Sequence, residues 1–165
     1  MKKVIRIKLD PNDIDRALKE IKDYRRSLDE KVSRFLAALL EEGVKVASAR
    51  LASTRGDSVN ATVDSYYVDS NGDMIKAVIA LNGEDCLFIE FGSGVVFNAV
   101  EHPLAAQMGY GPGTYPGQTH VPVPGYWYYG DGKLSVGTEA TMPMYGAAEH
   151  MRNIISAKAK EIFRS

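Results

Sequence analysis

The sequence predicts an α+β fold, in which a long N-terminal helix and a C-terminal helix pack on an antiparallel β-sheet. Three observations support it. Apolar residues recur at helical spacing before residue 55 and again after Pro143. From Val59 onward they alternate with polar residues, which is typical of strands. Residues 92–125 hold seven glycines and five of the seven prolines, and this composition indicates a long Gly/Pro-rich insertion rather than helix or strand.

The N-terminal region predicts a short strand followed by a long helix. Apolar residues alternate with basic ones up to Leu9, which predicts a short strand. Its apolar residues are Val4, Ile5, Ile7 and Leu9. Asp10 can cap a helix and Pro11 suits its first position. Because Ser27-Leu28-Asp29-Glu30 matches a capping box, two helices or one bent helix are expected, with Gly56 as the stop.

The middle of the chain predicts an antiparallel meander. Alternation over residues 59–63 and 75–81 around Asn71-Gly72 is typical of a hairpin. Asn82-Gly83 supplies a second turn, after which Leu87, Ile89 and Phe91 would continue the meander. The pattern leaves open whether residues 85–91 are strand or a helical turn.

The C-terminal third predicts a second hairpin and a final helix. Residues 126–129 and 133–136 flank Gly130-Asp131-Gly132, an Asp-Gly turn. Pro143 would open the last helix, whose apolar stripe is expected to pack on the sheet beside the N-terminal helix. We expect a single domain over residues 1–165, with residues 92–140 forming the loop and hairpin insertion.

Charge and cysteine content narrow the class of protein. The net charge is +5 over residues 1–55, −9 over residues 56–149 and +3 over residues 150–165. Surfaces of opposite sign favour docking between copies or with other proteins over binding to nucleic acid, and solvated helix faces are the alternative.

The single cysteine, Cys86, excludes an internal disulfide, so a cytoplasmic protein is the default. The charged N-terminus predicts neither a signal peptide nor a membrane span.

Candidate chemical groups are scattered. His102, His120 and His150 lie far apart without metal-ligand spacing, and Cys86 sits in an apolar run typical of a buried structural cysteine. We therefore expect no catalytic, cofactor or metal residues and no enzyme activity. The alternative from another class is a small metal-dependent hydrolase that uses His102, His120 and Glu90 around the Gly/Pro-rich loop.

The stretch from Cys86 to Gly94, after a long helix and a hairpin, resembles the signature of the gene-product-ten-like neck proteins of lambdoid and related siphophages. That signature reads valine or isoleucine, Glu, Phe, Gly, then Thr or Ser, and here it is Glu90, Phe91, Gly92 and Ser93. In the family a segment of the form Pro-Phe-Leu-x-x-Ala opens the last helix. Pro143 and Ala148 occupy that place, while Met144 and Tyr145 replace Phe-Leu and a longer stretch separates the motifs.

The resemblance implies a non-enzymatic virion protein at the head-to-tail junction, present in the host cytoplasm during assembly. It would form a homo-oligomeric ring that contacts other neck, connector and tail proteins, and it would not bind a membrane. DNA would pass through the channel of the ring without sequence-specific binding. A tail-completion or minor tail protein is the alternative. Exposed aromatics on a protruding loop are natural interface anchors, so we expect Tyr110, Tyr115, Tyr126, Trp127 and Tyr129 at the interface.

Overall fold

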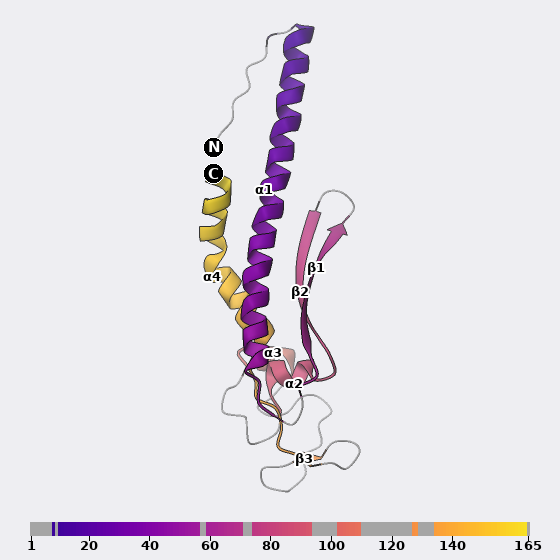
Figure 1. The fold of residues 1–165 in the computed structure, drawn as a ribbon, viewed down its shortest axis with the longest axis vertical. Helices are drawn as coiled ribbons and strands as arrows, with labels where there is room; N and C mark the ends of the chain where they lie inside the picture. The colour runs from indigo at the N-terminus through magenta and orange to yellow at the C-terminus, as the bar shows by residue number, and fades with distance from the viewer. Residues whose placement is uncertain are drawn as a thin grey trace. The chain divides into compact units, whose positions relative to one another are not determined.

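The computed structural model describes residues 8, 10–56, 59–70, 74–93, 102–109, 127–128 and 134–164 (Figure 1). The predicted mixture of helices and antiparallel strands, with a long N-terminal and a C-terminal helix, is confirmed. The chain divides into two compact units, residues 1–39 with 154–165, and residues 40–153. The single domain expected over residues 1–165 stays a prediction.

The first helix, α1, runs without interruption from Pro11 to Ala52. Asp10 caps it as predicted, since its Oδ1 accepts the Asp13 N–H at 3.1 Å. The expectation of two helices broken at Ser27-Leu28-Asp29-Glu30 is wrong, because these residues lie inside α1. The helix ends at Ala52, four residues before the end predicted at Gly56. Just beyond this end, the Ser53 hydroxyl donates to the Arg50 carbonyl at 2.7 Å. Of the strand predicted over residues 4–9, only Lys8 is described, and it is not assigned to a strand; the rest lies outside the described residues.

The first hairpin matches its prediction. Strand β1, Thr62–Ser70, pairs antiparallel with β2, Met74–Asn82. The register sets Thr62 opposite Asn82 and Tyr66 opposite Val78. Because side chains alternate between the two faces of a strand, Tyr66 and Tyr67 lie on opposite faces of the hairpin.

The meander does not continue beyond β2, and of the two alternatives left open for residues 85–91 the structure has the helical one. Residues Cys86–Phe91 form a short helix, α2, rather than a third strand. Two bonds turn the chain there, as the Asp85 carboxylate accepts the Asn60 N–H at 2.8 Å and the Asp85 N–H donates to the Asn60 carbonyl at 3.4 Å. A strand would present consecutive residues to opposite faces, whereas α2 buries Ile89, Glu90 and Phe91 together. A second short helix, α3, spans Ala105–Met108.

The remaining elements follow the sequence prediction. Strands β3, Trp127–Tyr128, and β4, Leu134–Ser135, pair antiparallel as the expected second hairpin. The last helix, α4, runs from Pro143 to Arg164. In the described part of the chain, none of the helices combines the length and apolar character that crossing a membrane requires.

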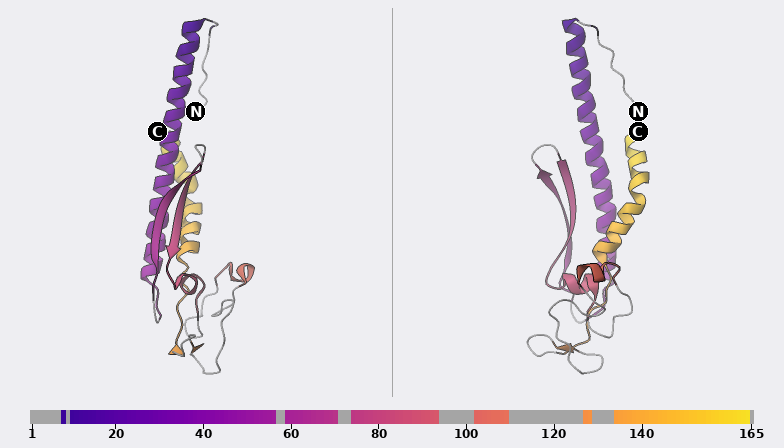
Figure 2. Two further views of the ribbon diagram at one scale, coloured as in Figure 1. Left: turned by 90° about the vertical axis from the view of Figure 1, so that its right-hand side faces the viewer. Right: turned by 180° about the vertical axis from the view of Figure 1, so that it is seen from behind.

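Within the unit of residues 40–153, Gly43 of α1 is a point of close approach. A Cβ atom at this position would clash with Ile79 of β2 and would lie 2.8 Å from the Met151 Sδ of α4. The glycine thus allows both the hairpin and α4 to approach α1 at this level. Figure 2 shows the ribbon of these elements from two further sides. The packing of α4 on the sheet stays a prediction, while Ile79 of β2 and Met151 of α4 both lie close to Gly43 of α1.

Candidate functional site

The two motifs that carry the resemblance meet at one junction in the unit of residues 40–153. Glu90, at 8% exposure, extends from α2 to the start of α4. Its Oε2 accepts the Met144 N–H at 2.9 Å and its Oε1 accepts the Tyr145 N–H at 2.8 Å. The first N–H groups of a helix have no partner inside the helix, and a carboxylate there also interacts favourably with the helix dipole. Glu90 therefore caps α4 from a distant part of the chain.

His102 completes this cap. Its Nε2 lies 3.2 Å from the Glu90 Oε1, while its Nδ1 accepts the Leu104 N–H at 3.0 Å. Because Nδ1 is an acceptor, the ring proton is assigned to Nε2, which donates to the carboxylate. The ring is 3% exposed and packs between Phe91 and Tyr145, with centroid distances of 4.5 and 5.1 Å.

The residues that follow Glu90 in the signature fix the backbone beside the cap. Gly92 has a φ of 78°, in the left-handed region, and a Cβ there would lie 3.0 Å from the Ala140 Cβ. Ser93 exchanges two backbone hydrogen bonds with Thr138, at 2.9 and 3.1 Å, and its hydroxyl also accepts the Thr138 N–H at 3.0 Å. These bonds join the end of α2 to the segment that leads into α4.

The residue before α4 takes an unusual conformation. Met142 has a φ of 52°, which is uncommon for a residue with a side chain. Its N–H donates to the Ile89 carbonyl at 3.3 Å, and the Thr141 N–H donates to the same oxygen at 3.1 Å. The contacts from α2 therefore hold both this strained entry and the first turn of α4 in place.

The chemistry available at this junction is that of a structural support. Both Glu90 oxygens and both His102 nitrogens are engaged in hydrogen bonds inside the protein. Across the described ranges, no group of three or more His, Cys, Asp or Glu residues is placed to hold a metal ion. Of the alternative hydrolase residues, His102 and Glu90 are brought together, whereas His120 lies outside the described residues.

Cys86 is half-buried rather than fully buried as the sequence predicted. The carbonyl oxygens of Leu81 and Gly83 both lie within hydrogen-bonding distance of its sulfur, at 3.3 and 3.0 Å, and share the single S–H donor. Burial raises the pKa of the Cys86 thiol, so the group stays protonated and is a poor nucleophile at neutral pH. This environment agrees with a structural role for the cysteine.

The predicted interface aromatics are left largely untested. Tyr110, Tyr115, Tyr126 and Tyr129 lie outside the described residues, and only the backbone of Trp127 is described, in β3. The remaining motif residues are placed: Pro143 is buried at the start of α4 and Ala148 is half-buried in it. The sequence associated His102 with Glu90 only in the hydrolase alternative, and it missed Thr138 as a partner of Ser93. The sequence signal for such partners was an acidic residue, Glu90, inside an apolar run, because a buried carboxylate needs hydrogen-bond donors.

No family model matches the chain, and neither the curated proteins nor the solved structures contain a match.

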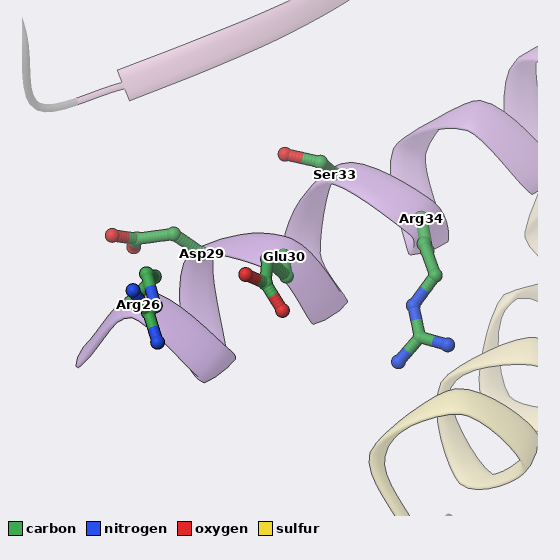
Figure 3. A pocket seen from close by; sticks show the side chains of 5 residues that line it. All are labelled: Arg26, Asp29, Glu30, Ser33 and Arg34. Carbon is green, nitrogen blue, oxygen red and sulfur yellow. The ribbon is translucent and has the colours of Figure 1, made fainter. Parts of the chain in front are cut away.

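A shallow hollow elsewhere offers no comparable arrangement. Figure 3 shows its lining side chains, which all come from α1 and are all exposed: Arg26, Asp29, Glu30, Ser33 and Arg34. Because one helix face supplies every group, no opposing wall would enclose a ligand.

An ion pair joins the segment after α1 to the segment before α4, and it predicts that stability is lost in acid. The Arg55 Nε and Nη2 donate to the two Glu139 oxygens at 2.8 and 3.0 Å. The hydrogen bond to Arg55 lowers the pKa of Glu139. A carboxyl group whose pKa is lower in the folded than in the unfolded chain stabilises the fold above its ordinary pKa, and this contribution disappears as the pH falls through the folded value.

Thermal unfolding measured against pH will test this pair. The melting temperature of the wild type is expected to exceed that of Glu139→Gln by a small, constant amount at neutral pH. The difference should shrink below the ordinary pKa of a glutamate. Arg55→Gln is the matched control, since it should show the same effect and add nothing to Glu139→Gln. A difference between wild type and Glu139→Gln that does not change with pH would contradict the assignment.

Proposed function

We propose that this chain is a structural virion protein at the head-to-tail junction of a siphophage, a neck protein that assembles with connector and tail proteins around the DNA channel. The observation that carries the proposal is the contact between the two motifs of the resemblance. Glu90 of the first motif caps the helix that the second motif opens at Pro143. The finer arrangement, with both helices on a sheet and residues 92–140 as an insertion, belongs to the same proposal.

This contact also accounts for the departures from the family pattern. Met144 and Tyr145 stand where the family has Phe-Leu, yet both meet Glu90 through their backbone N–H groups. A main-chain donor is available whichever side chain occupies the position, so the cap survives the replacement. The length of the intervening segment is equally free to vary, because the two ends are joined by these bonds.

The distribution of apolar side chains favours an assembly protein. Among the described residues, eight hydrophobic side chains are buried and half of them are alanines, whereas 14 large hydrophobic side chains are exposed. Several of them share one helix or one strand, such as Leu18 and Ile21 on α1 and Tyr66 and Val68 on β1. Groups of exposed apolar side chains mark surfaces that other proteins cover. The engaged state of Glu90 and His102 agrees with a structural rather than a catalytic role.

Deletion of the gene from the phage or prophage that encodes it tests the proposal. Negative-stain microscopy of the lysate is expected to show filled heads beside unattached tails, and wild-type protein supplied in trans should restore joined particles. Tails of abnormal length would favour the tail-completion or minor tail alternative. Intact infectious virions would overturn the neck proposal, and the zinc content of the purified protein would then test the hydrolase alternative.

A further inference from the structure

The first half of α1 carries an apolar stripe with the spacing of a coiled coil. We call Ile14, Leu18, Ile21 and Leu28 the α1 seam. Their spacing of four, three and seven residues is that of a heptad repeat, and Arg25 occupies the position that would otherwise complete it. Each of the four side chains is between 39 and 49% exposed. The stripe thus has the pattern of a helix–helix contact without the burial.

The same spacing continues into a part of α1 that a helix already covers. Val32, Phe35 and Leu39 extend the heptad, and in the unit of residues 1–39 and 154–165 Phe35 meets Phe163 of α4 at a centroid distance of 5.8 Å. Leu39 is buried. The contact with Phe35 falls at the last turn of α4, which ends at Arg164. The α1 seam is therefore continuous with an existing helix–helix contact.

We propose that the α1 seam binds the same seam of a second copy of this chain, with the two helices antiparallel. The seam is aligned so that Leu18 of each copy packs against Ile21 of the other. In this register the residues that flank the seam on one side, Asp15 and Lys22, face each other across the pair. Neither has an ion pair among the described residues. The twofold symmetry makes this contact twice.

The distribution of charge along α1 selects the antiparallel orientation. Residues 10–15 contain three aspartates and no basic residue, whereas residues 22–26 contain Lys22, Arg25, Arg26 and one aspartate. Antiparallel pairing places the acidic stretch of one copy beside the basic stretch of the other. Parallel pairing would instead bring the two Arg25 side chains into one layer, where like charges repel. A polar residue in a seam commonly sets orientation in this way.

This inference goes beyond the proposed function and does not rest on it. A twofold pair is a closed unit, whereas a ring needs a head-to-tail interface. The pair describes the free chain before it enters a larger assembly, when the apolar seam would otherwise face water. Failure of the neck proposal would leave the pair intact, and a monomeric chain would leave the neck proposal intact.

Sedimentation equilibrium of the purified full-length chain over a concentration series tests the pairing. The wild type is expected to dimerise, and Leu18→Asp with Ile21→Asp should weaken the dimer at least about a hundredfold. The matched control is Ser27→Asp with Ser33→Asp, which adds the same charge to exposed positions of α1 outside the seam and should leave the dimer unchanged. A wild-type chain that stays monomeric at every concentration would overturn the proposal.

Charge reversal tests the orientation. Asp15→Lys or Lys22→Asp alone creates like-charge contacts at both ends of the pair and should weaken the dimer about tenfold. The double reversal should restore wild-type affinity. Within one helix the two residues lie about 10 Å apart along the axis, too far to rescue each other inside the chain. A dimer that the single reversals leave unaltered would overturn the antiparallel register.

Discussion

Replacing Glu90 by alanine is expected to lower the free energy of unfolding by about 3–5 kcal/mol. The substitution leaves the N–H groups of Met144 and Tyr145 and the Nε2–H of His102 without their acceptor. The His102 donor is buried and the two backbone donors are part-buried, so water would replace the lost bonds only in part. Chemical denaturation followed by circular dichroism measures this loss directly.

A second glutamate on α4 provides the comparison. Glu149 pairs with Arg152 on the exposed side of the helix, so Glu149→Ala should change the free energy of unfolding by less than about 0.5 kcal/mol. Glu90→Gln should fall between the two, because the amide keeps one acceptor oxygen but turns an NH₂ group toward a backbone donor. If Glu90→Ala cost no more than Glu149→Ala, the cap at α4 would not be a principal support of the fold.

Replacing Gly83 by alanine is expected to cost at least about 3 kcal/mol of folding free energy. Gly83 has a φ of 142°, and a Cβ atom there would collide with the backbone of Asn60 and would lie 2.7 Å from the Ala61 Cα. The obstruction is main chain and cannot rotate away. The residues between β2 and α2 would have to move, with loss of the Asp85 bond to Asn60.

Gly109 separates the two causes of this cost. It also has a positive φ, of 77°, but no atom lies within 4 Å of a Cβ built there. Gly109→Ala should therefore cost only the conformational penalty, about 1–2 kcal/mol. The difference between the two variants in chemical denaturation reports the close approach at Asn60 together with the greater backbone strain at a φ of 142°. Equal losses would mean that conformation alone, and not the contact with Asn60, makes Gly83 necessary.

The sequence predicted those elements whose signals are local. The periodicity that defines α1 and α4 is repeated over several turns, and the Asp10 cap lies beside the helix that it starts. The first hairpin was equally accessible, because its alternation runs through two strands. These features depend on neighbours in the chain, so a single sequence contains most of the information.

The failures lie where distant residues decide the structure. Leu87, Ile89 and Phe91 alternate like a strand, but α2 is too short for helical periodicity to show. The bonds between Asp85 and Asn60 are made across the hairpin. The sequence grouped Glu90 with His102 only in the hydrolase alternative, and their shared role at the start of α4 was hidden, since it depends on residues from α2, α4 and the segment before α3. A helix opening at Pro143 without a capping side chain just before it was the available sign that the cap comes from elsewhere.

The hydrogen bonds at Glu90 make the two partners unequally tolerant of mutation, because a side chain accepts them and the backbone donates them. One side depends on a single carboxylate of fixed length, and the other side offers peptide groups that every residue except proline possesses. Over long divergence, the side chain at position 144 can therefore vary while Glu90 cannot, and position 145 is constrained only by its ring contact with His102. Distant relatives of such a protein would share little more than a glutamate, a glycine and a helix-opening proline, which is too short a signature for overall sequence similarity to register.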